Sequence, residues 1–100
     1  MANTLSIAPR AEADLMEAFK WYEAQSIGLG HEFLRCVEAR LNFIARMPQI
    51  FRRRGPLHRL ARTDRFPYAI YFIWDENEAH VAIRRVVHFK QNENSALSAP

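Results

Sequence analysis

The stretch that decides the fold is YAIYFIW, residues 68–74, in which every side chain is apolar or aromatic. A strand with one face in water alternates apolar and polar residues, so a run that is apolar on both faces indicates a strand in the middle of a sheet. The polar residues 75–77 then turn the chain, and residues 79–87 supply the pairing strand of a hairpin. We therefore expect a sheet with this hairpin at its centre.

The segment before this hairpin also has strand character. Residues 57–63 alternate in strand fashion and follow a turn at Gly55-Pro56. Residues 50–54 form either one more short strand or a loop. The second half of the chain is therefore expected to be mainly β-structure.

The first half of the chain has a helical period instead. Residues 4–7 are typical of a first strand, and Pro9 with the acidic residues after it marks a helix start. Apolar side chains then recur every three or four residues, Gly28 and Gly30 interrupt the pattern, and a second helix ends near Met47-Pro48. Two helices with so short a connection are expected to lie antiparallel as a helical hairpin.

Together these segments predict an α+β fold with the order β-α-α-β-β-β, in which a helical hairpin packs on one face of a mainly antiparallel sheet of three to four strands. The length of 100 residues allows one domain, which we place at residues 1–90, and residues 91–100 are expected to form a flexible tail. No stretch approaches the length of an apolar membrane span, and the start of the chain lacks a secretory signal. With a single cysteine, Cys36, these features indicate a cytoplasmic protein.

Charge is distributed unevenly along the chain. Residues 1–48 carry five Lys/Arg and six Asp/Glu, residues 49–90 carry nine and four, and residues 91–100 carry only Glu93, so that net charges of −1, +5 and −1 sum to +3. A basic second half beside a nearly neutral first half indicates an anionic partner, either nucleic acid or an acidic protein segment.

Three parts of the chain resemble members of the RelE/ParE toxin family. They are IAPRAEADL at residues 7–15, WYEAQ and GLGHEF at residues 21–33, and RFPYAIYF at residues 65–72. The resemblance extends over roughly residues 5–90, and the long helical hairpin with its Gly-Leu-Gly connection is more similar to the ParE branch than to the RelE branch. It implies a small toxin of a type II toxin–antitoxin module with the fold described above.

The resemblance also implies partners. A cognate antitoxin encoded by a neighbouring gene would cover the toxin with an amphipathic segment, giving a toxin–antitoxin hetero-oligomer. In ParE-like members the implied target is DNA gyrase, inhibited by binding, whereas RelE-like members are ribosome-dependent mRNA endoribonucleases. A family member that has lost toxicity and only binds its antitoxin is a third alternative. Family members often end the last strand with His, Gly and two arginines; here residues 88–92 keep the histidine and one cation.

Arginines dominate the candidate target-binding residues. Planar guanidinium groups suit phosphate and carboxylate, although a solvated basic sheet edge would also be rich in them. We expect Arg84 and His88, four residues apart on one strand, to share a face and to converge with Arg59 or Arg62. Arg85, on the other face among apolar residues, needs a partner or lies at the rim of the sheet. The expected target-binding set is Arg53, Arg54, Arg59, Arg62, Arg65, Arg84, His88 and Lys90.

Nuclease chemistry would need a base, an acid and cations around the scissile phosphate. The residues available for it are Arg62, Arg84 and His88, and no second histidine has an evident catalytic spacing. A histidine at a strand end is more often structural. Binding without covalent chemistry is therefore the preferred hypothesis.

The first helix supplies a candidate antitoxin surface. Trp21 falls off the apolar stripe of that helix, and an exposed tryptophan is a good interface anchor. Core packing is the alternative for the other aromatic residues. The expected antitoxin-binding set is Leu15, Phe19, Trp21, Tyr22, Phe33 and Val37. The His, Cys and carboxylate spacings match no metal site, no phosphate-binding glycine loop is present, and no cofactor is expected.

Overall fold

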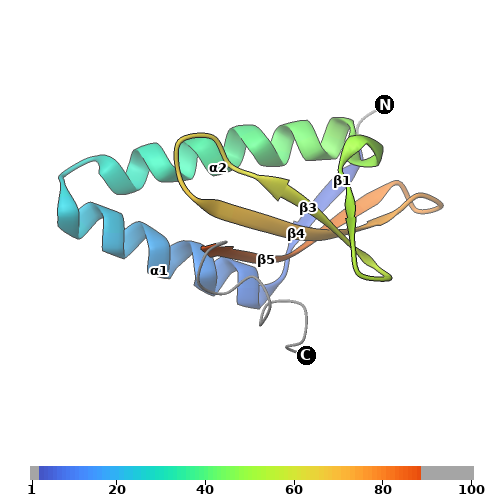
Figure 1. The fold of residues 1–100 in the computed structure, drawn as a ribbon, viewed down its shortest axis with the longest axis horizontal. Helices are drawn as coiled ribbons and strands as arrows, with labels where there is room; N and C mark the ends of the chain where they lie inside the picture. Colours follow the sequence, from blue (N-terminus) through green and yellow to red (C-terminus); the bar gives the residue numbers. More distant parts are fainter. Residues whose placement is uncertain (1–2, 89–100) are drawn as a thin grey trace.

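The computed structural model describes residues 3–88, which form two layers, with two helices packed on one face of a five-stranded sheet (Figure 1). In chain order the elements are β1 (Thr4–Ile7), α1 (Pro9–Gln25), α2 (Leu29–Arg46), the 3-10 helix η1 (Pro48–Ile50), β2 (Arg53–Arg54), β3 (His58–Arg62), β4 (Tyr68–Asp75) and β5 (His80–His88). The predicted α+β class and the helical hairpin are confirmed. The predicted domain boundary at residue 90 and the predicted flexible tail lie outside the described residues.

The sheet has the strand order β1-β5-β4-β3-β2, with β4 in the centre as predicted. Four neighbouring pairs connect its strands; three are antiparallel, and β1 runs parallel to β5. The predicted count of three to four strands is too low. The described sheet has five, because residues 53–54 form the separate two-residue strand β2 after η1. β1 and β5 can pair in parallel because the helical hairpin and strands β2 to β4 supply the long connection that a parallel pair requires.

A β-bulge interrupts the pairing of β4 with β5. Tyr71 lies opposite Arg85, and the next residue, Phe72, lies opposite Ile83, so Arg84 is an extra residue on β5. One inserted residue reverses which side chains face each way beyond that point. Accordingly Ile83 and Val86, an odd number of residues apart, both pack in the core beneath the helices.

The two faces of the sheet carry different clusters. The face beneath the helices, here called the helix face, contributes Ala61, Ile70, Phe72, Val81, Ile83 and Val86 to the main core. The opposite face, here called the distal face, has a small buried cluster of Ala69, Tyr71 and Val87 with Leu60 packed against it. Burial on both faces of β4 explains why the stretch at residues 68–74 is apolar throughout.

Aromatic rings join the helices to the sheet. Tyr22 on α1 stacks on Phe33 of α2 with ring centroids 5.3 Å apart. Phe66 meets Tyr22 and Phe33 edge-on at 4.9 and 5.4 Å, and Tyr68 lies 5.0 Å from Phe33. Such offset and edge-to-face pairs add to the free energy of burial. This cluster therefore fixes the tip of the helical hairpin against the loop between β3 and β4.

The turn between the helices is built around two glycines and one carboxylate. Gly28 has φ +91°, a left-handed conformation that favours glycine. A Cβ on Gly30 would lie 2.7 Å from the carbonyl oxygen of Phe19, so glycine allows the close approach of α1 and α2. The Glu23 carboxylate accepts hydrogen bonds from Gly28 N at 2.8 Å and Gly30 N at 2.9 Å, which satisfies free N–H groups at the start of α2. Within residues 3–88, neither helix is long and apolar enough to cross a membrane.

Candidate functional site

The arginines of β3 point to opposite faces of the sheet. Arg59 lies opposite Phe72, a residue of the helix face, whereas Arg62 lies opposite Ala69 of the distal face. Arg59 Nη1 donates a hydrogen bond of 2.7 Å to the carbonyl of Phe51, and its guanidinium lies 5.6 Å from the ring centroid of Trp74. Arg59 therefore cannot join a cluster of cations on the distal face. Of the two arginines, only Arg62 can.

The bulge separates Arg84 from His88. Arg84 follows Ile83 and is exposed on the distal face, whereas His88 follows the bulge and reaches the helix side, where its ring lies 5.6 Å from that of Tyr68. The prediction that Arg84 and His88 share a face is wrong, because it assumed unbroken alternation along β5. Arg62, Arg84 and His88 therefore do not converge on one point.

The distal face gathers three of the predicted target-binding arginines. His58 lies two residues before Leu60 on β3, so both side chains face the distal side. Arg54 pairs with His58 and therefore joins Arg62 and Arg84 on this face. Burial lowers the pKa of His58, and the charge of Arg84 lowers it further, which places these two groups close together. Within residues 3–88, the ion pairs of the structure include no carboxylate partner for Arg84.

The remaining predicted cations lie elsewhere. Arg53 pairs with Arg59, and its Nη1 donates to the carbonyl of Pro56 at 3.2 Å. Arg65 is in the loop between β3 and β4 with φ +71°, and its Nη1 lies 2.9 Å from Glu32 Oε1 on α2. Lys90 is outside the described residues. The predicted target-binding set is therefore divided among both sheet faces and the loop.

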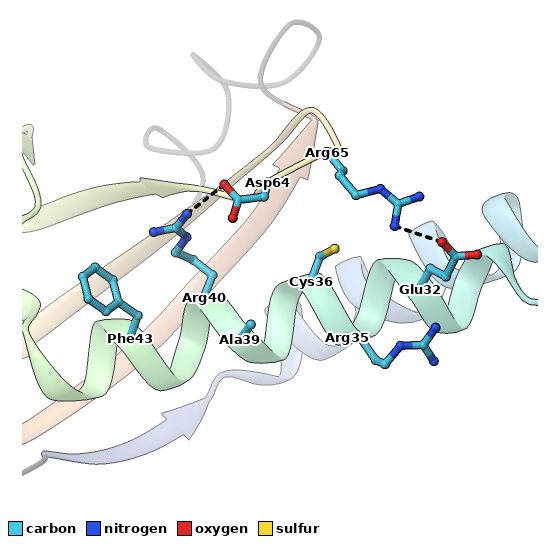
Figure 2. Close-up of a pocket in the computed structure, with 8 residues that line it drawn as sticks. All are labelled: Glu32, Arg35, Cys36, Ala39, Arg40, Phe43, Asp64 and Arg65. Carbon is cyan, nitrogen blue, oxygen red and sulfur yellow. Dashed lines mark hydrogen bonds and ion pairs between the residues drawn. The ribbon is translucent and has the colours of Figure 1, made fainter.

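A groove of about 460 Å³ separates the exposed side of α2 from the loop between β3 and β4 (Figure 2). Cys36 and Ala39 lie along it, between the Arg65–Glu32 ion pair at one end and the Arg40–Asp64 pair, at 3.0 Å, toward the other. Because the Asp64 side chain is 84% exposed, its ion pair contributes little to stability. The groove is bridged by charges that neutralise one another.

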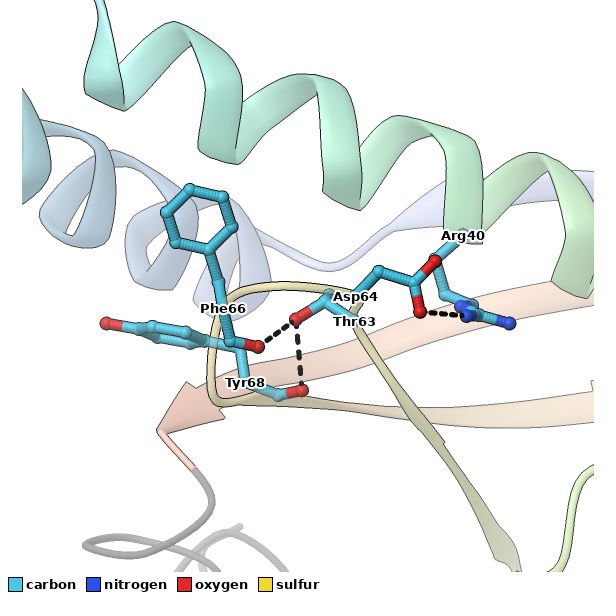
Figure 3. Close-up of polar contacts among 5 residues, drawn as sticks. All are labelled: Arg40, Thr63, Asp64, Phe66 and Tyr68. Carbon is cyan, nitrogen blue, oxygen red and sulfur yellow. Dashed lines mark hydrogen bonds and ion pairs between the residues drawn. The ribbon is translucent and has the colours of Figure 1, made fainter.

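The loop itself is held by the hydroxyl of Thr63. Figure 3 shows Thr63 Oγ1 between two carbonyls, to which it donates at 2.6 Å for Phe66 and 3.4 Å for Tyr68. The side chain of Arg40 reaches the same loop through Asp64. The loop is therefore fixed on the inside by a buried hydroxyl and on the outside by an exposed ion pair.

A larger cleft, of about 700 Å³, lies between α1 and the second half of β5. Within residues 3–88, no strand lies beside this edge of β5 beyond Ile83, because β1 ends there. Asp14 of α1 takes its place: its carboxylate accepts from Arg85 Nε at 2.8 Å, from Arg85 Nη2 at 3.1 Å and from Val86 N at 2.9 Å. The expectation that Arg85 needs a partner is confirmed, and sequence reasoning had missed Asp14 as that partner.

Two tyrosines line this cleft beside His88. They are Tyr22 and Tyr68, whose ring centroids lie 6.1 Å apart, and burial raises the pKa of both. For Tyr68, burial together with the proximity of Tyr22 raises the pKa to about 12. Both phenols are therefore neutral donors or acceptors near neutral pH and are poorly suited to act as a base.

The structure divides the predicted antitoxin-binding residues. Trp21 is 58% exposed at the cleft between α1 and β5, with its ring edge-on to Tyr22. Phe33 and Val37 are 0% and 2% exposed, so their side chains are core residues and the surface assignment was wrong for them. Leu15 and Tyr22 are partly buried against the same core. Phe19 is half-buried beside His31, with ring centroids 5.0 Å apart.

Among residues 3–88, no three His, Cys, Asp or Glu side chains lie close enough together to hold a metal ion. Cys36 is a free, half-buried cysteine. The described surface therefore offers guanidinium groups, an aromatic cleft and a groove as its candidate binding features.

Comparison with known proteins gives a family. The sequence profile described as "ParE toxin of type II toxin-antitoxin system, parDE" matches residues 5–93. No curated protein sequence matches the chain. The profile spans most of the chain, including both helices and all five strands.

Three solved structures share the fold. The RelBE2 toxin–antitoxin complex of Mycobacterium tuberculosis contains a chain with a TM-score of 0.66 and 22% identity, covering 88% of this chain and 99% of that one. The chromosomal ParDE system of P. aeruginosa gives 0.73 and 16%, covering 87% and 96%. A mutant of the E. coli toxin RelE in the free state gives 0.61 and 14%, covering 98% and 93%. At these identities the likeness concerns the fold.

Proposed function

Because the chain belongs to the ParE toxin family of type II toxin–antitoxin systems, we propose that it is a toxin that inhibits DNA gyrase by binding and is neutralised by a cognate antitoxin. The family supports the toxin role and the antitoxin partner. Gyrase as the target rests on the resemblance to the ParE branch. The protein would act in the cytoplasm, where both partners are found.

The observation that favours binding over RNA cleavage is the separation of the three candidate nuclease residues. General acid–base catalysis needs groups within hydrogen-bond reach of the same reacting atoms. Arg62 and Arg84 lie on the distal face, whereas His88 lies on the helix side of β5. The described residues therefore offer cations for contact more readily than a base and cations around one phosphate.

We assign target contact to the distal face. Arg62 and Arg84 are exposed there, on strands that flank the buried centre of the sheet. Because both arginines lie on strands of a rigid sheet, little backbone conformational entropy is lost on binding. Replacing both with glutamate should abolish toxicity while Arg35→Glu, at an exposed position on α2, leaves it unchanged.

We assign antitoxin contact to the cleft between α1 and β5, with Trp21 as its anchor. Trp21→Ala should weaken the toxin–antitoxin complex by about 30-fold, which corresponds to the roughly 2 kcal/mol lost at an interface hot spot. Met16→Ala is the matched control, because Met16 is on the same helix and 53% exposed but does not line the cleft. If the wild type and Trp21→Ala bind the antitoxin with equal affinity, the assignment of this cleft to the antitoxin is wrong.

The target is tested with purified protein in two assays run side by side. Gyrase supercoiling should be blocked while a translated message remains intact, and induction of the toxin alone should stop replication before translation. Cut messages with unimpaired supercoiling would identify a ribonuclease and overturn the proposal. No effect in either assay, with the antitoxin still bound, would identify a non-toxic antitoxin-binding member.

A further inference from the structure

The hairpin formed by β2 and β3, here taken as residues 51–60, carries arginines in addition to Arg62 and Arg84, the two on which the target contact proposed above depends. Arg52, Arg53, Arg54 and Arg59 lie within it, and no Asp or Glu occurs between residues 51 and 63. In Figure 1 the turn of this hairpin projects from the sheet in the direction away from α2. A cationic projection of this kind attracts polyanions.

Some arginines of the structure bind carboxylates, which neutralise their charge, and others bind backbone carbonyls, which do not. Arg40, Arg65 and Arg85 face carboxylates and are neutralised. Arg53 and Arg59 instead donate to the carbonyls of Pro56 and Phe51, which orient a guanidinium and leave its charge intact. Arg53 and Arg59 therefore combine fixed geometry with a charge that no carboxylate in the described residues neutralises through a printed ion pair.

The backbone of the hairpin is short and tightly built. Arg54 pairs with His58, so a loop of three residues, Gly55, Pro56 and Leu57, closes the turn. Gly55 has φ +85°, which is a conformation that favours glycine, and the bond from Arg59 to Phe51 closes the base at 2.7 Å. A loop this short holds its tip in one arrangement.

The tip of the hairpin is apolar. Leu57 is 66% exposed and follows the exposed Pro56, while cations precede and follow them. Proteins that enter the DNA minor groove commonly present a Pro or Leu to the base steps while arginines hold the phosphates beside it. The minor groove is about 6 Å wide, and the backbones of two paired strands, about 5 Å apart, would already fill it. No room would remain for their side chains, so only the tip of a hairpin can enter.

We infer that the β2–β3 hairpin is a contact for duplex DNA, with Arg52, Arg53, Arg54 and Arg59 on the backbone phosphates and Pro56-Leu57 at the minor groove. Single-stranded nucleic acid is less suited, because the tip offers no aromatic ring on which bases stack. The exposed apolar tip distinguishes the site from a uniformly charged surface that would suit an acidic peptide. The contact concerns DNA itself and stands whether or not gyrase is the target.

The test is fluorescence anisotropy with a labelled 20-base-pair duplex at 50 to 200 mM KCl. Four phosphate contacts weaken binding by about 150-fold over this range, and two contacts by about 12-fold, since each contributes roughly 0.9 to the slope of log K against log salt. The variant R52Q/R53Q should therefore lower the slope by about two. The control R35Q/R46Q removes the same charge from exposed positions on α2 and should keep the wild-type slope.

Leu57→Ala tests the tip, because it keeps every charge. It should weaken duplex binding several-fold at unchanged salt slope, and a small minor-groove ligand should displace the wild-type protein. An unchanged slope in R52Q/R53Q, an equal loss in R35Q/R46Q, or tighter binding of a 20-residue oligoglutamate than of the duplex would overturn the inference. Circular dichroism and antitoxin binding report whether each variant is folded.

Discussion

Removing the Asp14 carboxylate is predicted to destabilise the protein more than any other exposed or half-buried charge change discussed above. Asp14 accepts three hydrogen bonds at 2.8, 3.1 and 2.9 Å, two from Arg85 and one from Val86 N. The two ionic side chains are only 14% and 15% exposed. Asp14→Ala would therefore leave a guanidinium and a backbone N–H without partners at the edge of β5.

Breaking a buried ion pair by removing one partner costs about 3–5 kcal/mol. For a domain whose total free energy of unfolding is about 5–15 kcal/mol, this is about a fifth of the stability or more. The matched control is Asp64→Ala, which breaks the ion pair with Arg40 where Asp64 is 84% exposed, and it should cost about 0–1 kcal/mol.

Urea denaturation followed by circular dichroism measures both variants, with equal m-values required for the comparison. The double variant D14A/R85M should recover part of the loss, because it removes the buried charge as well as its partner. If Asp14→Ala and Asp64→Ala shift the midpoint equally, the carboxylate does not protect the edge of β5 in the way described.

Three further outcomes follow from the helical hairpin and the cleft. Gly30→Ala places a Cβ 2.7 Å from the carbonyl oxygen of Phe19, so the helices must separate; we expect a loss of about 1–3 kcal/mol in thermal or urea unfolding, and an unchanged stability would refute the close contact. Hydrogen bonds from backbone N–H groups lower the pKa of Glu23, so its contribution to stability is present above about pH 4.5 and is lost as the pH falls through the lowered folded-state pKa; Glu23→Gln should flatten the stability curve in this acid range, and identical acid limbs would contradict it. Tyr68 should ionise near its pKa of about 12 in a spectrophotometric titration, because burial raises that pKa, and Tyr68→Phe should remove the step; its persistence would assign it to another tyrosine.

Local pattern was sufficient for most of the fold. The helices begin and end close to the residues where the three-to-four period starts and stops, since period and glycine position are properties of neighbouring residues. The central position of β4 followed from its apolar residues on both faces. The candidate site was predicted less well, because faces were assigned by assuming strict alternation along β5.

Residue type alone also misplaced two side chains. Phe33 and Val37 belong to an apolar stripe, and a stripe is compatible with either a core or an interface. The choice depends on whether another element covers the stripe. Here the sheet and the loop between β3 and β4 cover it, which is a contact between segments about 30 residues apart in the chain.

The amino-acid sequence by itself determined the two amphipathic helices, their tight glycine turn, the central strand and the concentration of arginines in the second half, because each depends on residues within a few positions of one another. Tertiary structure alone decided that Arg62 and Arg84 share the distal face while Arg59 and His88 do not, and that Asp14 meets Arg85. These arrangements arise from strand register, one extra residue in β5 and a contact between residues 71 positions apart. None of the three can be recognised from the pattern of neighbouring residues.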